Sequence, residues 1–234
     1  MSERYYVNSP IADHVVLQGA EARHLAVVCR KRPGDVICLF NGDGCEYRAE
    51  ITSVDKKRVD LTVIDTTSPP RELPFSLDVA CPLPKGDRGQ FLIEKLTELG
   101  VTSFMPLRTR RSVVHPSESR SEKLERYVIE ASKQCGRNVL MRIAPLQFLD
   151  DLLRRPELPA QRLLADPSGR PLTRPALLLH TIIAIGPEGG FAEEELAAAT
   201  AALWQSVSLG PRTLRVETAA LAMAALFGHT STSV

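Results

Sequence analysis

The chain has 234 residues, of which 44% are hydrophobic, and its formal net charge at pH 7 is +1. This length can hold one large domain or two small ones, and the hydrophobic share is enough to build cores. No apolar run approaches the length of a membrane span, and the first residues, M-S-E-R-Y-Y, lack the cationic start and apolar core of a signal peptide. We therefore expect a cytoplasmic protein with no membrane partner.

The cysteines, histidines and charged residues indicate which kinds of site and partner to expect. The five cysteines contain no C-x-x-C pair and the five histidines no H-E-x-x-H motif, so we expect reduced core thiols and no metal site. Positive charge is concentrated in the middle of the chain, where residues 85–142 carry 12 Lys and Arg against 7 Asp and Glu. Such a segment favours an anionic partner such as RNA, although a solvated face explains it as well.

Residues 4–66 are expected to form a small β-barrel. Apolar or alternating runs predict four strands, and one short helix is predicted over Glu21–Arg30. The sequence N-G-D-G at 41–44 is typical of a tight hairpin turn between two of these strands. The predicted strands are Val15–Leu17, Asp35–Phe40, Tyr47–Val54 and Val59–Ile64.

Residues 66–70, T-T-S-P-P, predict a linker, so we place one domain over 1–70 and a second over 71–234. Beyond this linker strands and helices alternate, which predicts an α/β fold with a parallel sheet and helices on both faces. Helices are expected over Gln90–Leu99 and Glu217–Phe227, with a longer one between them that begins at Ser117. The expected strands are Leu77–Ala80, Val101–Leu107, Leu163–Ala165, Ile182–Ile185 and Val207–Leu209.

Two of these strands end in Gly-Pro, and we expect the loops that follow them to lie side by side and to bind a ligand. In the first loop, Gly186, Gly189 and Gly190 allow a ligand to approach the backbone closely. Three glutamates, 193–195, open the next helix and would repel a phosphate, and the spacing fits neither common phosphate-binding motif. A ligand without phosphates therefore fits better, and a tight turn with no ligand remains the alternative.

The motifs I-G-P-E-G-G-F and L-G-P-R-T-L-R-V-E-T-A resemble the signature of the SPOUT methyltransferases. The resemblance is strongest to the ribosomal RNA small subunit methyltransferase E family, which methylates uridine N3 in 16S ribosomal RNA. It extends to Lys85–Val101, to R-R-S-V at Arg110–Val113 and to E-A-S-K-Q-C-G-R at Glu130–Arg137. The resemblance implies a C-terminal trefoil-knotted parallel-sheet domain, a PUA-like β-barrel before it, S-adenosyl-L-methionine as cofactor and a homodimer.

The resemblance also implies roles for individual residues. Arg215 would stabilise negative charge on the pyrimidine, and Glu188 or Glu217 would orient it or act as base; an ion pair within the loop is the alternative for Arg215 and Glu217. The cofactor-binding residues would be Ile185, Gly186, Pro187, Glu188, Gly189, Gly190, Leu209, Gly210 and Leu214. The RNA-binding residues would be His24, Arg30, Arg32, Lys85, Arg88, Arg110, Arg111 and Arg137.

These observations favour an enzyme that methylates N3 of a uridine in 16S ribosomal RNA or the small ribosomal subunit. A second hypothesis is a non-catalytic RNA-binding protein of the same fold that serves ribosome assembly. A third is a related SPOUT methyltransferase that acts on ribose or on another RNA. The intact glycines and charges of both loops favour a catalytic protein over the second hypothesis.

Overall fold

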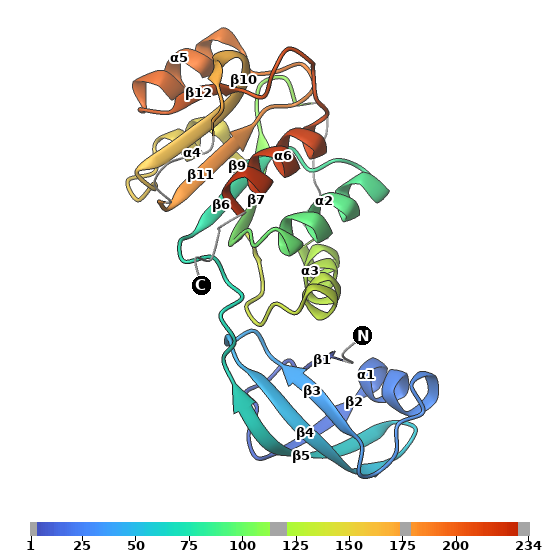
Figure 1. Ribbon diagram of the computed structural model, residues 1–234. Coiled ribbons are helices and arrows are strands. Elements are labelled where there is room, and N and C mark those ends of the chain that lie inside the picture. The colour runs from blue at the N-terminus through green and yellow to red at the C-terminus, as the bar shows by residue number, and fades with distance from the viewer. Residues whose placement is uncertain (1–3, 113–120, 174–178, 229–234) are drawn as a thin grey trace. The chain divides into compact units, whose positions relative to one another are not determined.

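The structure is a computed structural model that describes residues 4–112, 121–173 and 179–228 (Figure 1). It divides into two compact units, which we describe separately. The barrel unit comprises residues 1–72 and 132–140, and the sheet unit comprises residues 73–131 and 141–234. The segment 132–140 belongs to the barrel unit, whereas the sequence predicted one boundary at residue 70. The expected domain limits, 1–70 and 71–234, stay a proposal.

The barrel unit is a five-stranded sheet in the order β1-β3-β4-β5-β2, curled around an apolar core (Figure 1). Along β2 the burial alternates, with Val15 and Leu17 inward, as expected for a strand with one wet face. Among the described strands of this unit, β1 and β3 pair in parallel, and the other pairs are antiparallel. The elements are β1 (Arg4–Tyr6), β2 (His14–Gln18), α1 (Gly19–Arg23), the π-helical turn η1 (His24–Val28), β3 (Val36–Phe40), β4 (Glu46–Val54) and β5 (Arg58–Thr67).

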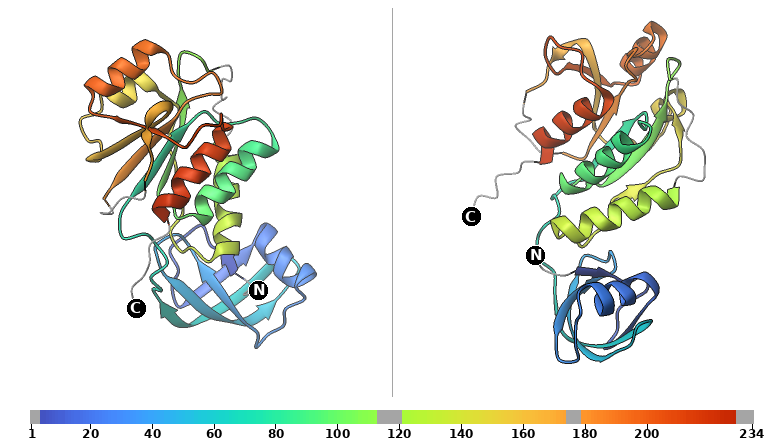
Figure 2. Two further views of the ribbon diagram at one scale, coloured as in Figure 1. Left: turned by 45° about the horizontal axis from the view of Figure 1, so that its top comes forward. Right: turned by 90° about the vertical axis from the view of Figure 1, so that its right-hand side faces the viewer.

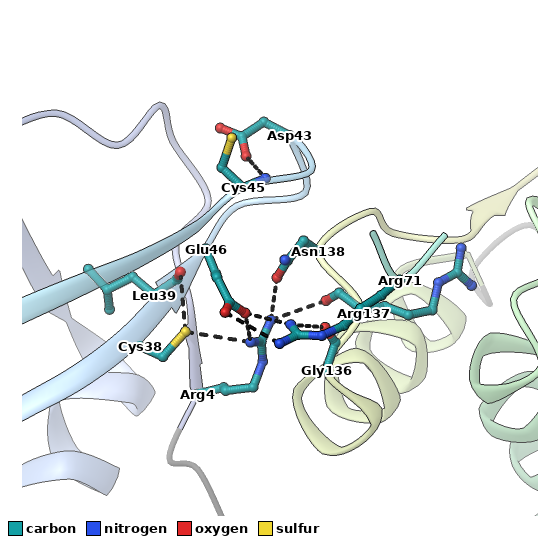
Figure 3. Close-up of polar contacts among 10 residues, drawn as sticks. All are labelled: Arg4, Cys38, Leu39, Asp43, Cys45, Glu46, Arg71, Gly136, Arg137 and Asn138. Atoms are coloured by element: carbon teal, nitrogen blue, oxygen red, sulfur yellow. Dashed lines mark hydrogen bonds and ion pairs between the residues drawn. The ribbon is translucent and has the colours of Figure 1, made fainter. Parts of the chain in front are cut away.

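A cluster of arginines and carboxylates joins distant segments of the barrel unit (Figure 3). The Arg4 guanidinium, whose side chain is only 4% exposed, donates to Glu46 Oε2 at 2.7 Å and to Asn138 Oδ1. Arg71 Nη1 donates to the Gly136 carbonyl at 2.9 Å and also pairs with Glu46. These hydrogen bonds lower the pKa of the Glu46 carboxyl, Arg71 contributing most. Glu46 is therefore an ionised anchor for the segment 132–140.

The sheet unit is built on a parallel sheet in the order β12-β10-β11-β6-β7-β8, with β9 paired to β7 (Figure 1). Helices α2 and α6 lie side by side against one face, and α4 and α5 pack together on the other (Figure 2). The elements are β6 (Leu77–Cys81), α2 (Asp87–Glu98), β7 (Ser103–Arg108), α3 (Ser121–Cys135), β8 (Arg142–Ile143), β9 (Gln147–Phe148), α4 (Leu149–Leu153), β10 (Gln161–Pro171), β11 (Thr181–Ile185), α5 (Glu193–Ala201), β12 (Gln205–Ser208) and α6 (Val216–Gly228). The boundary between the two units falls within α3, after residue 131.

The predicted α/β class and the predicted strands and helices are confirmed, with bounds that differ by a few residues. The expected single helix after residue 20 is instead α1 followed by the wider turn η1, and the expected cap Ser117 lies outside the described residues. Of the five cysteines only Cys81 is buried, so the expectation of core thiols is wrong for the other four, which are half-buried. In the described ranges no helix is long and apolar enough to cross a membrane.

Candidate functional site

A cavity of about 310 Å³ opens between the middle of β10 and the loops that follow β11 and β12. Neighbouring parallel strands end at the same edge of a sheet, so these segments meet although they are far apart in sequence. Small-molecule sites typically measure about 300–1,000 Å³, and this cavity is at the lower end. The structure brings together all nine residues that the sequence assigned to the cofactor, namely 185–190, Leu209, Gly210 and Leu214.

The loop after β11 owes its shape to glycine and to one buried aromatic ring. The Gly190 amide donates to the Pro187 carbonyl at 2.8 Å, and Gly190 has a φ of +69°, which favours glycine. A Cβ on Gly186 would lie 3.1 Å from the ring of Phe191, and Phe191 is only 4% exposed. The turn therefore packs tightly on Phe191 and presents backbone groups to the cavity.

A bulge in β10 forms another wall of the cavity. The pairing of β10 with β12 changes register between Ala165 and Arg170. A Cβ on Gly169 would lie 2.5 Å from backbone atoms of Ser206 and Val207, so only glycine fits there. The intervening residues place Asp166 on the cavity wall, where its carboxylate accepts the Ser168 amide at 2.8 Å. The cavity thus has a carboxylate that the sequence analysis did not identify.

Glu195 in the first turn of α5 joins two loops. Its Oε2 accepts the Ala192 amide at 2.8 Å, while its Oε1 accepts the Arg110 amide at 2.8 Å. The residue is only 2% exposed, and both carboxylate oxygens are satisfied by backbone donors. Glu195 therefore caps its own helix and holds the loop after β7 against the loop after β11.

The same pair of loops is joined a second time through Arg111. Arg111 Nη1 donates to the Gly189 carbonyl at 2.7 Å, and Arg111 lines the cavity. Its neighbour Arg110 is exposed and lies 3.4 Å from Glu194 Oε2. Both of these arginines were expected to bind RNA; Arg111 contacts the candidate ligand loop directly, and the exposed Arg110 lies beside it.

The three expected catalytic residues, Glu188, Glu217 and Arg215, do not lie together at one site. Arg88 Nη1 lies 3.6 Å from Glu217 Oε1 and 4.0 Å from Glu188 Oε1, so this arginine bridges two of them. Glu217 is 7% exposed, and within the described chain its Oε2 has no hydrogen-bond partner. Arg215 is exposed and does not line the cavity, and its carbonyl accepts the Ala219 amide at 2.9 Å. Its catalytic role stays a prediction.

Among the other expected RNA-binding residues, Arg137 is buried in an ion pair. Its side chain is 5% exposed, and its guanidinium donates to both carboxylate oxygens of Glu72, at 2.6 Å to Oε2 and 3.2 Å to Oε1. A guanidinium buried in such a pair helps to hold the barrel unit together, and the expected contact of Arg137 with RNA stays a prediction. His24, Arg30 and Arg32 are exposed in the barrel unit, and Lys85 is exposed just before α2.

Several residues that line the cavity were missed by the sequence analysis. Phe191, Arg212 and Thr213 lie inside the motifs that carry the family resemblance, so the signal for them was present. Asp166 had no such signal, because its position depends on the bulge that β10 forms against β12.

Within the described part of the sheet unit, neither a reactive thiol nor a metal cluster is evident. Burial raises the pKa of the Cys81 thiol, and the charge of Glu217 raises it further, so this thiol stays protonated. In the three described ranges no group of three or more His, Cys, Asp or Glu side chains is arranged to hold a metal ion.

An open apolar groove adjoins the cavity. It runs between α6 and the strand ends of β10 and β12, and it shares Leu209, Gly210 and Leu214 with the cavity. Its other apolar lining includes Leu172, Ala222 and Leu226. The groove thus extends one wall of the candidate site along the surface of α6.

Comparison with protein families gives two matches. A model described as an RNA methyltransferase domain matches residues 71–228, and a model described as an RNA methyltransferase PUA domain matches residues 17–64. The first match contains every residue of the cavity, and the second covers most of the curled sheet of the barrel unit.

Individual relatives match along nearly the whole chain. A protein of Bacillus subtilis named ribosomal RNA small subunit methyltransferase E is 34% identical over 88% of this chain and 86% of its own. The protein of the same name from Synechocystis is 35% identical over 88% of this chain and 69% of its own.

Two solved structures have the same fold. The structure of ribosomal RNA small subunit methyltransferase E from Neisseria gonorrhoeae, bound to S-adenosyl methionine, has a TM-score of 0.87 at 31% identity and covers 96% of each chain. A protein of Legionella pneumophila, in complex with the bound cofactor, has a TM-score of 0.88 at 31% identity and covers 97% of each chain.

Proposed function

Because the chain belongs to the ribosomal RNA small subunit methyltransferase E family, we propose that it transfers a methyl group from S-adenosylmethionine to N3 of a uridine in 16S ribosomal RNA. The observation that carries this proposal is the convergence of the two Gly-Pro loops on one cavity. The assignment of the substrate atom, N3 of a uridine, rests on the family resemblance. The cavity supports the binding of a small ligand between the two loops.

The residues of the cavity fit S-adenosylmethionine. Apolar side chains such as Ile185, Phe191 and Leu209 suit an adenine ring, and the backbone of 186–190, which lines the cavity, offers hydrogen bonds to it. The carboxylates of Asp166 and Glu188 suit the positive charges and hydroxyl groups of this ligand, which carries no phosphate. The glutamates at the start of α5 agree with that chemistry, because they disfavour a phosphate.

When bound, S-adenosylmethionine supplies a methyl group activated by an adjacent sulfonium. The chain's own task is to place the uridine ring, accept the N3 proton and stabilise the negative charge that spreads over the two carbonyl oxygens. We assign the stabilisation of this charge to Arg88 or Arg215 and the acceptance of the proton to Glu188 or Glu217, two carboxylates that Arg88 bridges. Glu188 lines the cavity, whereas Glu217 is buried and its Oε2 has no hydrogen-bond partner within the described chain, so both carboxylates are candidates for the base.

Calorimetry in the presence of a chelator tests the cofactor. We expect heat of binding for S-adenosylmethionine or its demethylated product without added metal. Mapping methylated nucleotides in 16S ribosomal RNA from cells with and without the gene then tests the substrate. No binding of either compound to folded protein would favour a non-catalytic RNA-binding protein, and a methyl group at ribose or in another RNA would favour a related methyltransferase.

The groove along α6 supports a homodimer as the working form. It is apolar, it lies on the surface, and it continues into the wall of the cavity. A second copy seated there would cover exposed apolar area and exclude water from the candidate site. We therefore expect the dimer interface to include α6 and to complete the ligand site.

A further inference from the structure

An exposed aromatic ring and an arginine are placed together beside the candidate site. Strand β9 pairs in parallel with β7, and the register puts Phe148 next to Arg108. The Arg108 guanidinium lies 5.4 Å from the centre of the Phe148 ring, while 47% of Phe148 is exposed. Backbone pairing thus places a partly exposed guanidinium over an exposed aromatic ring.

This pair borders a hollow of about 280 Å³ that adjoins the first cavity. The two share the loop after β7, because Arg111 lines the first cavity while Thr109, Arg110 and Ser112 line the hollow. Glu195 forms part of its floor, with both carboxylate oxygens already bound to backbone amides. The loop that separates the two spaces is therefore held in place by a buried contact.

The chemistry of the hollow favours a nucleobase over a phosphate. Unpaired bases of RNA stack on aromatic rings and on arginine guanidinium planes, and both surfaces are present here. The exposed carboxylate of Asp150 also lines the hollow and would repel a phosphate, but it accepts a hydrogen bond from the amino group of a base. Ser112 adds a hydroxyl group that donates or accepts.

We propose that the hollow bounded by Phe148 and Arg108 binds an unpaired base of the RNA substrate, a neighbour of the nucleotide that enters the first cavity. This inference rests on the proposed RNA substrate and adds a subsite to it. Phe148 supplies the stacking face, Arg108 supplies a second flat face and a positive charge, and Asp150 selects for a base with an amino group.

The test uses the full chain and a synthetic fragment of 16S ribosomal RNA that contains the target uridine in its unmethylated form. Loss of one base–aromatic stack is worth about 1–3 kcal/mol, so Phe148→Ala should weaken RNA binding about 5- to 150-fold. Phe91→Ala is the matched control, because Phe91 is also 47% exposed and has Lys95 over its ring at 5.9 Å, but it does not line the hollow. Cofactor affinity should stay unchanged in both variants.

Removing single bases from the RNA fragment identifies the partner of Phe148. One abasic position next to the target should weaken binding to the wild-type protein and have little further effect on Phe148→Ala, as expected for two halves of one contact. Unchanged RNA affinity in Phe148→Ala would overturn the proposal. A shift from dimer to monomer with unchanged RNA affinity would overturn it too and would assign Phe148 to a protein interface.

Two further measurements keep the result interpretable. Phe148→Leu preserves apolar packing but not stacking, so it should still weaken RNA binding if Phe148→Ala fails to fold, and normal binding by it would contradict the subsite. Methyl transfer is measured on the same samples. A protein that binds RNA through Phe148 but transfers no methyl group would contradict the proposed reaction and leave the subsite intact.

Discussion

The guanidinium groups of Arg88 and Arg215 differ in their neighbours and in their exposure to solvent. Arg88 lies within 4.0 Å of two carboxylates, so its positive charge is partly neutralised by Glu188 and Glu217. Arg215 is exposed at the start of α6, directly after a loop that lines the cavity. An exposed guanidinium is suited to hold the two carbonyl oxygens of a deprotonated uridine through paired hydrogen bonds.

We predict that Arg215→Ala folds, still binds the cofactor and loses on the order of a hundredfold in single-turnover methylation, as loss of one charge-stabilising donor typically costs. Arg215→Lys should recover only part of the rate, because it keeps the charge but not the forked geometry. Arg154→Ala, which removes an exposed arginine at the end of α4, is the control. A lower melting temperature with a normal rate per folded molecule would reduce Arg215 to a structural role.

At the scale of loops and helices, Glu195 couples the candidate cofactor loop to the loop that carries Arg110 and Arg111. Glutamine at this position keeps one acceptor oxygen but turns an amide group toward the second backbone N–H. One of the two contacts is then lost, and a buried backbone donor is left without a partner, at a cost of about 1–3 kcal/mol.

Glu195→Gln is therefore expected to weaken cofactor binding about tenfold and to lower the melting temperature. Glu193→Gln is the matched control, since it removes the same charge from the same helix turn at an exposed position. Calorimetry and thermal unfolding on both variants make the comparison. If Glu195→Gln lowers stability but leaves cofactor affinity intact, the residue is only a helix cap.

In the barrel unit, Glu46 makes stability depend on pH. Hydrogen bonds from Arg71 and Arg4 lower its folded pKa below that of the unfolded chain, so its contribution is fully present above the ordinary carboxyl pKa. That contribution is lost as pH falls through the folded pKa. Acid should therefore weaken the attachment of segment 132–140, which Arg4 and Arg71 hold through Asn138 and Gly136.

We predict that Glu46→Gln lowers the free energy of unfolding by about 2 kcal/mol at pH 7, because the nearly buried Arg4 loses its counter-charge. The difference from the wild type should shrink at acidic pH, where Glu46 is protonated in both states. Urea unfolding followed by circular dichroism at several pH values measures it, with Glu50→Gln on the exposed side of β4 as control. A constant difference at all pH values would contradict the assignment.

For the whole molecule, the proposed dimer is tested on the groove along α6. Leu226→Asp places a charge among the apolar side chains of this groove and should convert the dimer to a monomer. Leu203→Asp is the control, because Leu203 is 76% exposed and lies outside the groove. Light scattering at micromolar concentration measures the oligomeric state of both variants. A wild-type monomer that still transfers methyl groups would rule out the dimer as the working form.

The sequence alone determined most of the elements and the place of the cavity. Short apolar runs that end in Gly-Pro mark β11 and β12 as well as the loops behind them, because glycine and proline act on the backbone locally. Residues 66–70 marked the end of β5, and the family motifs indicated which loops meet. Each of these signals lies within a few neighbouring residues, where pattern and propensity apply.

Only the tertiary structure decided which charged side chains are exposed to a ligand and which are held in contacts within the protein. Arg137 looked like an RNA ligand but is buried against Glu72, and Glu195 looked like one of three similar glutamates but joins two loops. Asp166 and the Phe148–Arg108 pair depend on the register between strands far apart in the chain. Such pairings are set by the packing of the whole sheet, so neither composition nor local spacing contains them.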